Sequence, residues 1–317
     1  MRPLRPAIAF LCTAVVGWLT VPVAVAAADV RLAAATPAIE KSIEASGAEV
    51  AVAFRTLDGE EEWFLRADES FHAASTMKIA VMIELYRQVH EGKVRLDEPL
   101  PVHNAFRSVV DGSPFSLDPG DDSETGLYQA EGSTRTLGEL DELMITVSSN
   151  LATNLLMDKL GIANIGAGVR QLDATGLEVV RDLEDGKAFA QNRNNTTTAR
   201  ALLVLLTAIA EGRAVGRGSS AQMSAVLERQ TFNDRIPAGL PRGTRVAHKT
   251  GEITKICHDA AIVYAPKPFV LVVLTRGLAD TGQASALIAD VTRQLYAATQ
   301  AAVTAPATAG SPPSRTH

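Results

Sequence analysis

The first residues that suggest chemistry are Ser75 and Lys78, three positions apart at the start of a helical apolar pattern. Side chains three apart on a helix are neighbours, so the hydroxyl and the amine would face each other. A serine is a weak nucleophile until a base lies beside it, and burial can lower the pKa of a lysine so that it serves as that base. Backbone N–H groups at a helix start can also stabilise an oxyanion. Taken alone, the pair is better explained as a capping serine and a solvated lysine.

A second polar segment, Ser148-Ser149-Asn150, falls between two predicted helices. Serine and asparagine are common helix caps, and capping alone would explain the segment. A catalytic interpretation is also open, in which the Ser148 hydroxyl relays a proton and the Asn150 amide holds a substrate carbonyl. The segment by itself does not decide between the two.

A third segment, Lys249-Thr250-Gly251, ends a predicted strand. A glycine at that point lets a substrate approach the backbone closely. The Lys249 side chain would supply positive charge, and the Thr250 hydroxyl can bind a carboxylate. Without the other two segments this is an ordinary strand end.

The three patterns occur in this order along the chain, each on the kind of element that the chemistry needs. Together they resemble the Ser-x-x-Lys, Ser-Asp-Asn and Lys-Thr-Gly motifs of class A β-lactamases and penicillin-binding proteins. The resemblance extends from about residue 40 to residue 298 and includes Asn154, four positions after Asn150. It implies an acyl-enzyme mechanism and an α+β, β-lactamase/transpeptidase-like fold.

The resemblance also implies a role for each motif residue. Ser75 would be the acylated nucleophile and Lys78 the amine that helps to activate it. Ser148 would carry a proton to the leaving nitrogen. The residues expected to bind substrate or stabilise its oxyanion are Asn150, Lys249, Thr250, Gly251 and Ile253. In that set the N–H of Ile253, just past Gly251, would complete the oxyanion hole with the N–H of Ser75.

Two positions depart from the class A pattern. Ser149 stands where these β-lactamases usually carry Asp, a change expected to alter local hydrogen bonding. The loop that begins at Arg181 is short and lacks the Glu-x-x-x-Asn sequence whose Glu activates the deacylating water. Glu184 either takes that role or is an exposed carboxylate paired with Arg181 or Lys187. Without a base for water, the chain would stay acylated.

The sequence therefore predicts a serine hydrolase acting on a β-lactam amide or an acyl-D-alanine peptide. A D-Ala-D-Ala carboxypeptidase or esterase is the alternative within the same chemistry, and a penicillin-binding or sensing module without turnover is the other. We expect no cofactor and no metal, because no Cys/His cluster has zinc spacing. His72 and His258 lack a triad-like Asp partner in the sequence. Cys257 lies in an apolar, strand-like stretch, so we expect a buried structural cysteine rather than a catalytic thiol.

The elements that must position these residues follow from apolar periodicity. Predicted strands cover residues 48–56, 63–65, 244–250, 258–264 and 269–275. Predicted helices cover residues 36–46, 75–91, 136–147, 150–159, 164–174 and 281–299, and two more open at Thr196–Thr198 and Ser219–Ser220. Because strands at both chain ends bury their faces only by pairing with one another, we expect a mostly antiparallel sheet flanked by helices.

Between the strands, residues 95–235 are expected to form an all-helical subdomain of one hydrolase domain, residues 29–300. Residues 103–130 form a long acidic loop, and loops of such length usually have a function. The loop would either cover the pocket or only decorate the surface. The Ala-, Thr-, Pro- and Ser-rich segment 301–317 is predicted to be a disordered tail.

The first 28 residues read as a secretory signal peptide, with Arg2 and Arg5 before an apolar run that is shorter than the roughly 20 residues of a membrane span. We therefore expect a secreted or periplasmic protein, a monomer, without a stable membrane span. Cleavage leaves 28 of the 30 basic residues against 36 acidic ones, a net charge of −8. This balance argues against nucleic acid and anionic lipid as partners.

Overall fold

The computed structural model describes residues 25–300, and its framework is a five-stranded antiparallel sheet with strand order β2-β1-β11-β10-β9. The strands are β1 (Glu49–Thr56), β2 (Glu62–Leu65), β9 (Arg245–Ile253), β10 (Ile256–Tyr264) and β11 (Phe269–Arg276). The predicted pairing of the two chain ends is confirmed, because β1 pairs with β11 along its whole length. The predicted signal peptide lies mostly, and the predicted tail entirely, outside the described residues.

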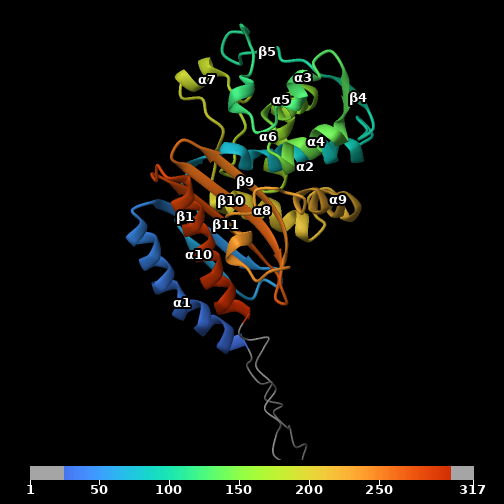
Figure 1. Cartoon of the computed structure of the whole chain (residues 1–317). Coiled ribbons are helices and arrows are strands. Elements are labelled where there is room, and N and C mark those ends of the chain that lie inside the picture. The colour runs from blue at the N-terminus through green and yellow to red at the C-terminus, as the bar shows by residue number, and fades with distance from the viewer. Residues whose placement is uncertain (1–24, 301–317) are drawn as a thin grey trace, which may run out of the picture.

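Both faces of the sheet are covered by helices (Figure 1). On one face, α1 (Val25–Ser46) and α10 (Thr281–Gln300) pack against apolar side chains that include Val50, Val52 and Phe54. On the other face, α8 (Ala199–Ala210) packs against a second core that includes Ala51 and Ala53. Strand β1 is therefore buried on both sides, so its alternating pattern distributes residues between two cores.

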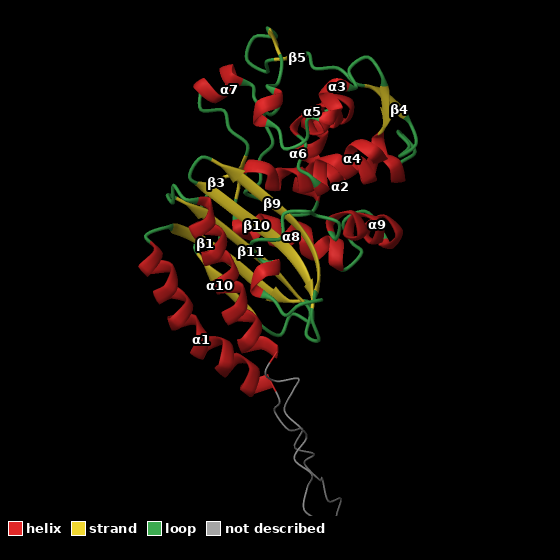
Figure 2. Cartoon of the chain, viewed as in Figure 1, coloured by secondary structure: helices red, strands yellow, loops and turns green. Residues whose placement is uncertain are grey.

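The central part of the chain forms a mainly helical region next to the edge strand β9 (Figure 2). Its helices are α2 (Lys78–His90), α3 (Gly126–Gln129), α4 (Leu137–Thr146), α5 (Asn150–Leu160), α6 (Ile162–Gln171), α7 (Gly186–Ala190) and α9 (Arg217–Leu227). Residues 95–235, predicted to be helical throughout, contain short strands, since the loops between helices need partners for their backbone groups, and one short strand before residue 95 pairs with the last of them. These strands are β3 (Phe71–His72), β4 (Pro99–Pro101), β5 (Phe106–Arg107), β6 (Pro114–Phe115), β7 (Thr134–Thr136) and β8 (Thr196–Thr197).

Most predicted helix ends are confirmed, and the differences have local causes. The capping box of α4 is present, with Thr136 and Glu139 bonded in both directions. Helix α8 begins only after Thr198, because Thr196 and Thr197 pair with β3. Helix α1 begins at residue 25 rather than 36, and α7 was not predicted because it has only five residues.

Three 3-10 turns complete the described elements: η1 (Ala74–Met77), η2 (Pro119–Asp121) and η3 (Pro237–Gly239). Turn η1 leads directly into α2, so the segment that carries Ser75 is wound more tightly than the helix after it. Cys257 is a free, buried thiol, as its apolar surroundings predicted. No helix within residues 25–300 is long and apolar enough to cross a bilayer.

Candidate active site

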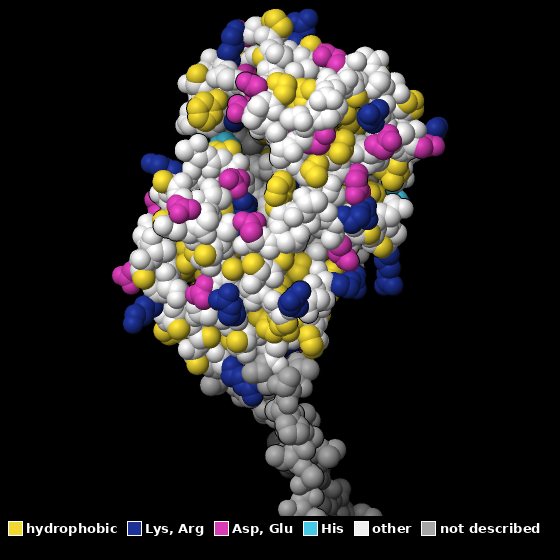
Figure 3. Space-filling view, viewed as in Figure 1, with side chains coloured by type: hydrophobic (Ala, Val, Ile, Leu, Met, Phe, Trp, Pro, Cys, Tyr) yellow, Lys and Arg dark blue, Asp and Glu magenta, His cyan; other side chains and the backbone are white. Residues whose placement is uncertain are grey.

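The three sequence segments meet at one cleft of about 970 Å³ between the sheet edge and the helical region. The predicted residues that line it are Ser75, Ser148, Asn150, Glu184, Thr250 and Ile253. The space-filling view shows the surface hollowed between these two parts, with acidic and basic side chains mixed on the visible face (Figure 3). Lys78 and Lys249 lie behind this lining, fully buried.

Close packing of β9 against η1 brings the first and third segments together. A Cβ atom added at Gly251 would lie 3.1 Å from the Thr76 nitrogen and 3.2 Å from the Ala74 Cβ. These distances are tighter than ordinary contact, so only glycine lets the strand lie this close to the turn. Gly251 therefore has a structural role that the sequence did not predict, and it lies within β9 rather than at the strand end.

Ser148 joins the two buried lysines. Lys78 Nζ donates to the Ser148 carbonyl oxygen at 2.7 Å and lies 3.2 Å from Ser148 Oγ. Lys249 Nζ donates to the same hydroxyl oxygen at 3.0 Å. The Ser148 hydroxyl is thus placed between two amines, within reach of a proton from either.

Burial changes the protonation of both lysines. Loss of solvation lowers the pKa of Lys78 to about 7, although the negative charges of Asp122 and Glu184 oppose the shift. Burial also lowers the pKa of Lys249, and the neighbouring Lys78 adds to that effect. Lys78 therefore has a substantial neutral fraction near pH 7, the form in which an amine can accept a proton.

Asn150 links Lys78 to Glu184. The Asn150 Oδ1 atom accepts from Lys78 Nζ at 2.9 Å, and Asn150 Nδ2 donates to Glu184 Oε1 at 3.2 Å. The other Glu184 oxygen accepts from the Asp118 N–H at 2.9 Å. Burial raises the pKa of Glu184. A half-buried carboxylate in this position has the surroundings of a general base.

The two alternative partners of Glu184 are engaged elsewhere. Arg181 donates to the Asp182 carbonyl oxygen, and Lys187 forms an ion pair with Asp111 at 2.7 Å. Glu184 is therefore not the exposed, paired carboxylate of the second interpretation. Asn154 fixes the loop from the helix side, since its amide both donates to and accepts from the Leu183 backbone.

Strained backbone gathers around the cleft. Ala74, Ser148 and Glu184 all have a positive φ, at 45°, 61° and 61°. Such a conformation costs a residue other than glycine on the order of 1–2 kcal/mol. The surrounding contacts must offset that cost, and they hold the Ser148 and Glu184 side chains toward the cleft.

The ladder between β9 and β10 corrects one predicted residue. A two-residue turn, Thr254–Lys255, separates the strands, and Ile253 pairs with Ile256 across it. The residues that flank such a turn exchange both N–H···O bonds, and the next pair along does not. The N–H of Ile253 is therefore used by β10, whereas the N–H of Glu252 points from the sheet edge toward η1. This register therefore favours Glu252 over the predicted Ile253 as the second donor of the oxyanion hole.

His72 and His258 both form hydrogen bonds with backbone groups near the cleft. His258 Nε2 lies 3.0 Å from the His72 carbonyl oxygen, and His72 Nδ1 accepts from the Ala74 N–H. Complete burial lowers the pKa of His258 to about 4. These contacts hold the turn before Ser75 and agree with the absence of a triad-like partner in the sequence.

Arg235 is a residue that sequence reasoning missed. It is buried, lines the cleft, donates to the carbonyl oxygens of Gly251 and His258, and contacts the Glu252 carboxylate. It adds a cation behind the Lys249 strand, where a substrate carboxylate is expected. No pattern around Arg235 marks it in the sequence, because its partners lie 16 to 23 positions further along the chain.

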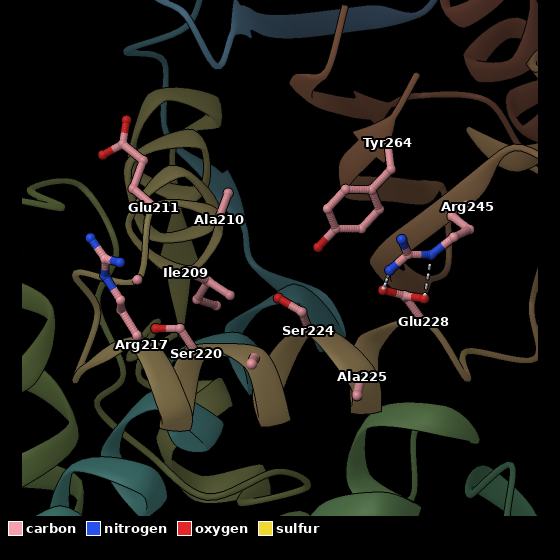
Figure 4. Close-up of a pocket in the computed structure, with 12 residues that line it drawn as sticks. Ile209, Ala210, Glu211, Arg217, Ser220, Ser224, Ala225, Glu228, Arg245 and Tyr264 are labelled. Atoms are coloured by element: carbon pink, nitrogen blue, oxygen red, sulfur yellow. Dashed lines mark hydrogen bonds and ion pairs between the residues drawn. The ribbon is translucent and has the colours of Figure 1, made fainter. Parts of the chain in front are cut away.

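A second hollow, of about 560 Å³, lies between the end of α8, α9 and the strands β9 and β10 (Figure 4). It contains the serines Ser220 and Ser224, but no lysine lines it. Two arginines, Arg217 and Arg245, also line it, and Arg245 is bonded to Glu228 at 2.6 Å. In residues 25–300, no group of three or more His, Cys, Asp or Glu side chains could hold a metal ion.

Comparison with known proteins places this geometry in a family. Residues 34–299 match the model of the β-lactamase enzyme family. The β-lactamase AST-1 of Nocardia asteroides is 32% identical over 235 residues, which make up 72% of this chain and 72% of that protein.

Solved structures agree with this match. A β-lactamase from Sphaerobacter thermophilus has a TM-score of 0.71 at 29% identity and covers 88% of this chain and 99% of its own. The protein PBP-A has a TM-score of 0.72 at 27% identity, with 84% and 97% covered. A PBP-A mutant is described as an acyl-enzyme complex with penicillin G.

Proposed function

The chain belongs to the β-lactamase enzyme family, and from this premise we propose that it hydrolyses the amide bond of a β-lactam through an acyl-enzyme on Ser75. The family membership makes the chain a β-lactamase-like serine hydrolase. The observation that carries the mechanism is the buried Lys78 amine, with a pKa of about 7, three residues after Ser75 and 3.2 Å from Ser148 Oγ.

Acylation follows from these positions. Neutral Lys78 takes the proton of Ser75 as the Ser75 oxygen attacks the lactam carbonyl carbon. The negative charge that develops on the carbonyl oxygen is stabilised by the N–H groups of Ser75 and Glu252. The C–N bond then breaks, and the proton passes from Lys78 through the Ser148 hydroxyl to the leaving nitrogen.

The polar groups on the β9 side of the cleft would orient the substrate. Thr250 and Arg235 line the cleft on this side, and Lys249 is buried behind them. The proposal therefore favours substrates that carry a carboxylate beside the scissile amide, as penicillins do. A charge-assisted contact of this kind supplies orientation as well as affinity.

Deacylation requires a base for water, and Glu184 is the proposed base. It is half-buried, its pKa is raised, and two hydrogen bonds hold its carboxylate. The same two hydrogen bonds favour a second candidate function, penicillin binding without turnover. If they hold Glu184 away from the water, the acyl-enzyme persists.

We also propose that the protein is exported and acts as a monomer in the periplasm or outside the cell. The basic start and short apolar run in residues 1–28 support the export proposal. N-terminal sequencing of the protein secreted by an expressing cell tests it. A mature chain that begins after residue 26 or 28 is expected, and a secreted chain that retains Arg2 would contradict cleavage.

Intact-mass spectrometry after incubation with penicillin G, together with nitrocefin turnover, tests the main proposal. Rapid turnover with a transient adduct on the Ser75 peptide is expected. A stable adduct with negligible turnover would select the second candidate function. If neither adduct nor turnover appears, both functions are wrong for this chain.

A further inference from the structure

The acidic loop between α2 and α4 places one buried carboxylate, that of Asp122, at the N-terminus of α5. Asp122 Oδ2 accepts from the backbone N–H groups of Asn150 and Leu151, at 2.8 and 2.9 Å. The same oxygen accepts from the Tyr128 hydroxyl at 2.9 Å and lies 3.4 Å from Ser149 Oγ. These bonds satisfy helix N–H groups that have no partner within the helix, and they place a negative charge at the positive end of α5.

Asn150 is the first residue of α5, and its side chain lies between Lys78 and Glu184. A shift of its backbone would move both hydrogen bonds at once. We propose that Asp122 is a positioning residue of the active site. It fixes the position of Asn150 and, through Asn150, that of the Lys78 amine. It does so in place of the Asp that the Ser-Asp-Asn motif carries where this chain has Ser149.

The middle residue of the motif explains why a carboxylate from elsewhere is needed. Ser149 is fully buried and caps only the Ala152 N–H, through its short hydroxyl. Without Asp122, the N–H groups of Asn150 and Leu151 would have to bond to water. A loop that crosses the front of α5 supplies the missing charge, so the segment 103–130 does more than decorate the surface.

The charge of Asp122 also acts on Lys78 directly. The charged groups that face Lys78 are Asp122 from the acidic loop, Glu184 from the loop before α7, and Lys249 from β9. The charged groups that face Asp122 are Lys78 and Glu184, and the neutral Tyr128 hydroxyl donates to it. Because the negative charge of Asp122 raises the pKa of Lys78, removing it should lower that pKa further.

The proposal rests on the proposed function, and Asp122→Asn tests it. The variant keeps an acceptor oxygen but loses the charge. We expect the plateau of kcat/KM for penicillin G to fall about 10- to 100-fold, because a small misplacement of catalytic groups has effects of that size. The acid limb of the pH profile should also move to lower pH. A merely structural role would lower the folded fraction and leave the limb in place.

The matched control is Glu124→Gln, which removes one charge from the same loop, two positions away. Among the described residues, the Glu124 carboxylate accepts from the N–H groups of Gly126 and Leu127, one on each oxygen, and Gln keeps one of these acceptors. Its pH profile and plateau should equal those of the parent chain. A parent-like plateau and limb in Asp122→Asn would overturn the proposal.

A reciprocal pair of variants makes the test independent of folding losses. Ser149→Asp in the parent chain places two carboxylates against each other, so it should lower both kcat/KM and the melting temperature. In the Asp122→Asn background the same change restores the carboxylate and should recover at least tenfold in kcat/KM. Equal effects of Ser149→Asp in both backgrounds would contradict the proposal.

The melting temperatures of these four proteins separate the two hypotheses. If the parent chain forms no adduct with penicillin G, the proposed function fails. If Ser149→Asp then lowers the melting temperature of the parent chain but raises that of the Asp122→Asn variant, the result would still support the contact of Asp122 with the N-terminus of α5. If the parent chain is acylated but this effect does not change sign between the two backgrounds, the positioning proposal fails and the proposed function stands.

Discussion

The active-site cleft and the second hollow beside α9 contain similar residue types, yet only one is arranged for chemistry. Both are lined by serines, arginines and carboxylates. In the cleft, Lys78 is fully buried, whereas the side chain of Arg245 in the second hollow is 66% exposed. Arg245 is also neutralised by Glu228 and stacks on Tyr264, 4.6 Å from the ring centroid.

The two hollows differ in the solvation and ion pairing of their basic side chains. Within residues 25–300, neither Lys78 nor Lys249 forms an ion pair, and both have exchanged water for hydroxyl, carbonyl and amide oxygens. That exchange favours the neutral amine and hence proton transfer. An exposed, ion-paired arginine keeps its charge at every accessible pH, so a serine beside it stays a plain hydroxyl.

The largest effect should come from exchanging serine for alanine in each hollow. Ser75→Ala should lose the penicillin adduct and about 10⁶-fold in kcat, the loss seen when a catalytic serine is removed from a serine protease. Ser224→Ala, in the second hollow, should leave the adduct and the turnover unchanged. Intact-mass spectrometry of both variants checks this, and an adduct on Ser75→Ala would show that another residue is the nucleophile.

The next largest effect concerns the carboxylates. Glu184→Gln should slow deacylation by about 10²- to 10⁴-fold, because general-base assistance to water is removed. Acylation should continue, so the acyl-enzyme accumulates and becomes visible by mass. The matched variant Glu228→Gln should turn over nitrocefin at the parent rate. Unchanged turnover in Glu184→Gln would remove Glu184 from the mechanism.

The pH dependence of acylation sharpens the comparison further. Lys78 must be neutral to accept a proton, and its pKa is lowered to about 7. The acylation rate should therefore be constant well above pH 7 and fall about tenfold for each pH unit below it. Stopped-flow measurement with nitrocefin between pH 5 and 9 checks this, and a flat profile down to pH 5 would exclude Lys78 as the base.

The smallest effect is on stability. The lowered pKa of Lys78 means that the unfolded chain binds more protons than the folded chain between about pH 7 and the ordinary lysine pKa of about 10.4. The Lys78 contribution to the free energy of unfolding therefore rises with pH across this window.

Replacing Lys78 by Met removes the cost of burying an amine. The variant should be inactive but about 1–2 kcal/mol more stable at pH 7, in keeping with the trade between stability and activity. Arg245→Met should change stability by less than about 0.5 kcal/mol, since the side chain is exposed. Urea unfolding of both variants measures this, and a destabilised Lys78→Met would mean that its hydrogen bonds outweigh its burial cost.

Much of the fold was determined by the sequence alone. The alternation of Val50, Val52 and Phe54 predicted β1, and the apolar run from Phe269 predicted β11. Turn and cap residues such as Gly92 and Thr136 predicted where helices end and begin. These signals are local, because a strand or helix pattern depends on residues only a few positions apart.

The sequence likewise predicted some features of the candidate site, and others came only from the structure. Three short motifs identified Ser75, Ser148 and Lys249, since the chemistry needs those residue types at fixed spacings. Glu184 was identified as a candidate, but only the structure gave it Asn150 as a partner in place of Arg181.

Only the tertiary structure showed which N–H groups the β9–β10 ladder leaves free and which carboxylate contacts the N-terminus of α5. The first depends on the β9–β10 register, where a shift of one residue exchanges Glu252 for Ile253. The second depends on a loop that brings Asp122 to Asn150 across 28 positions of chain. The sequence determines what each segment is able to do, whereas contacts between distant segments depend on packing, because apolar periodicity shows which face is buried and not what lies against it.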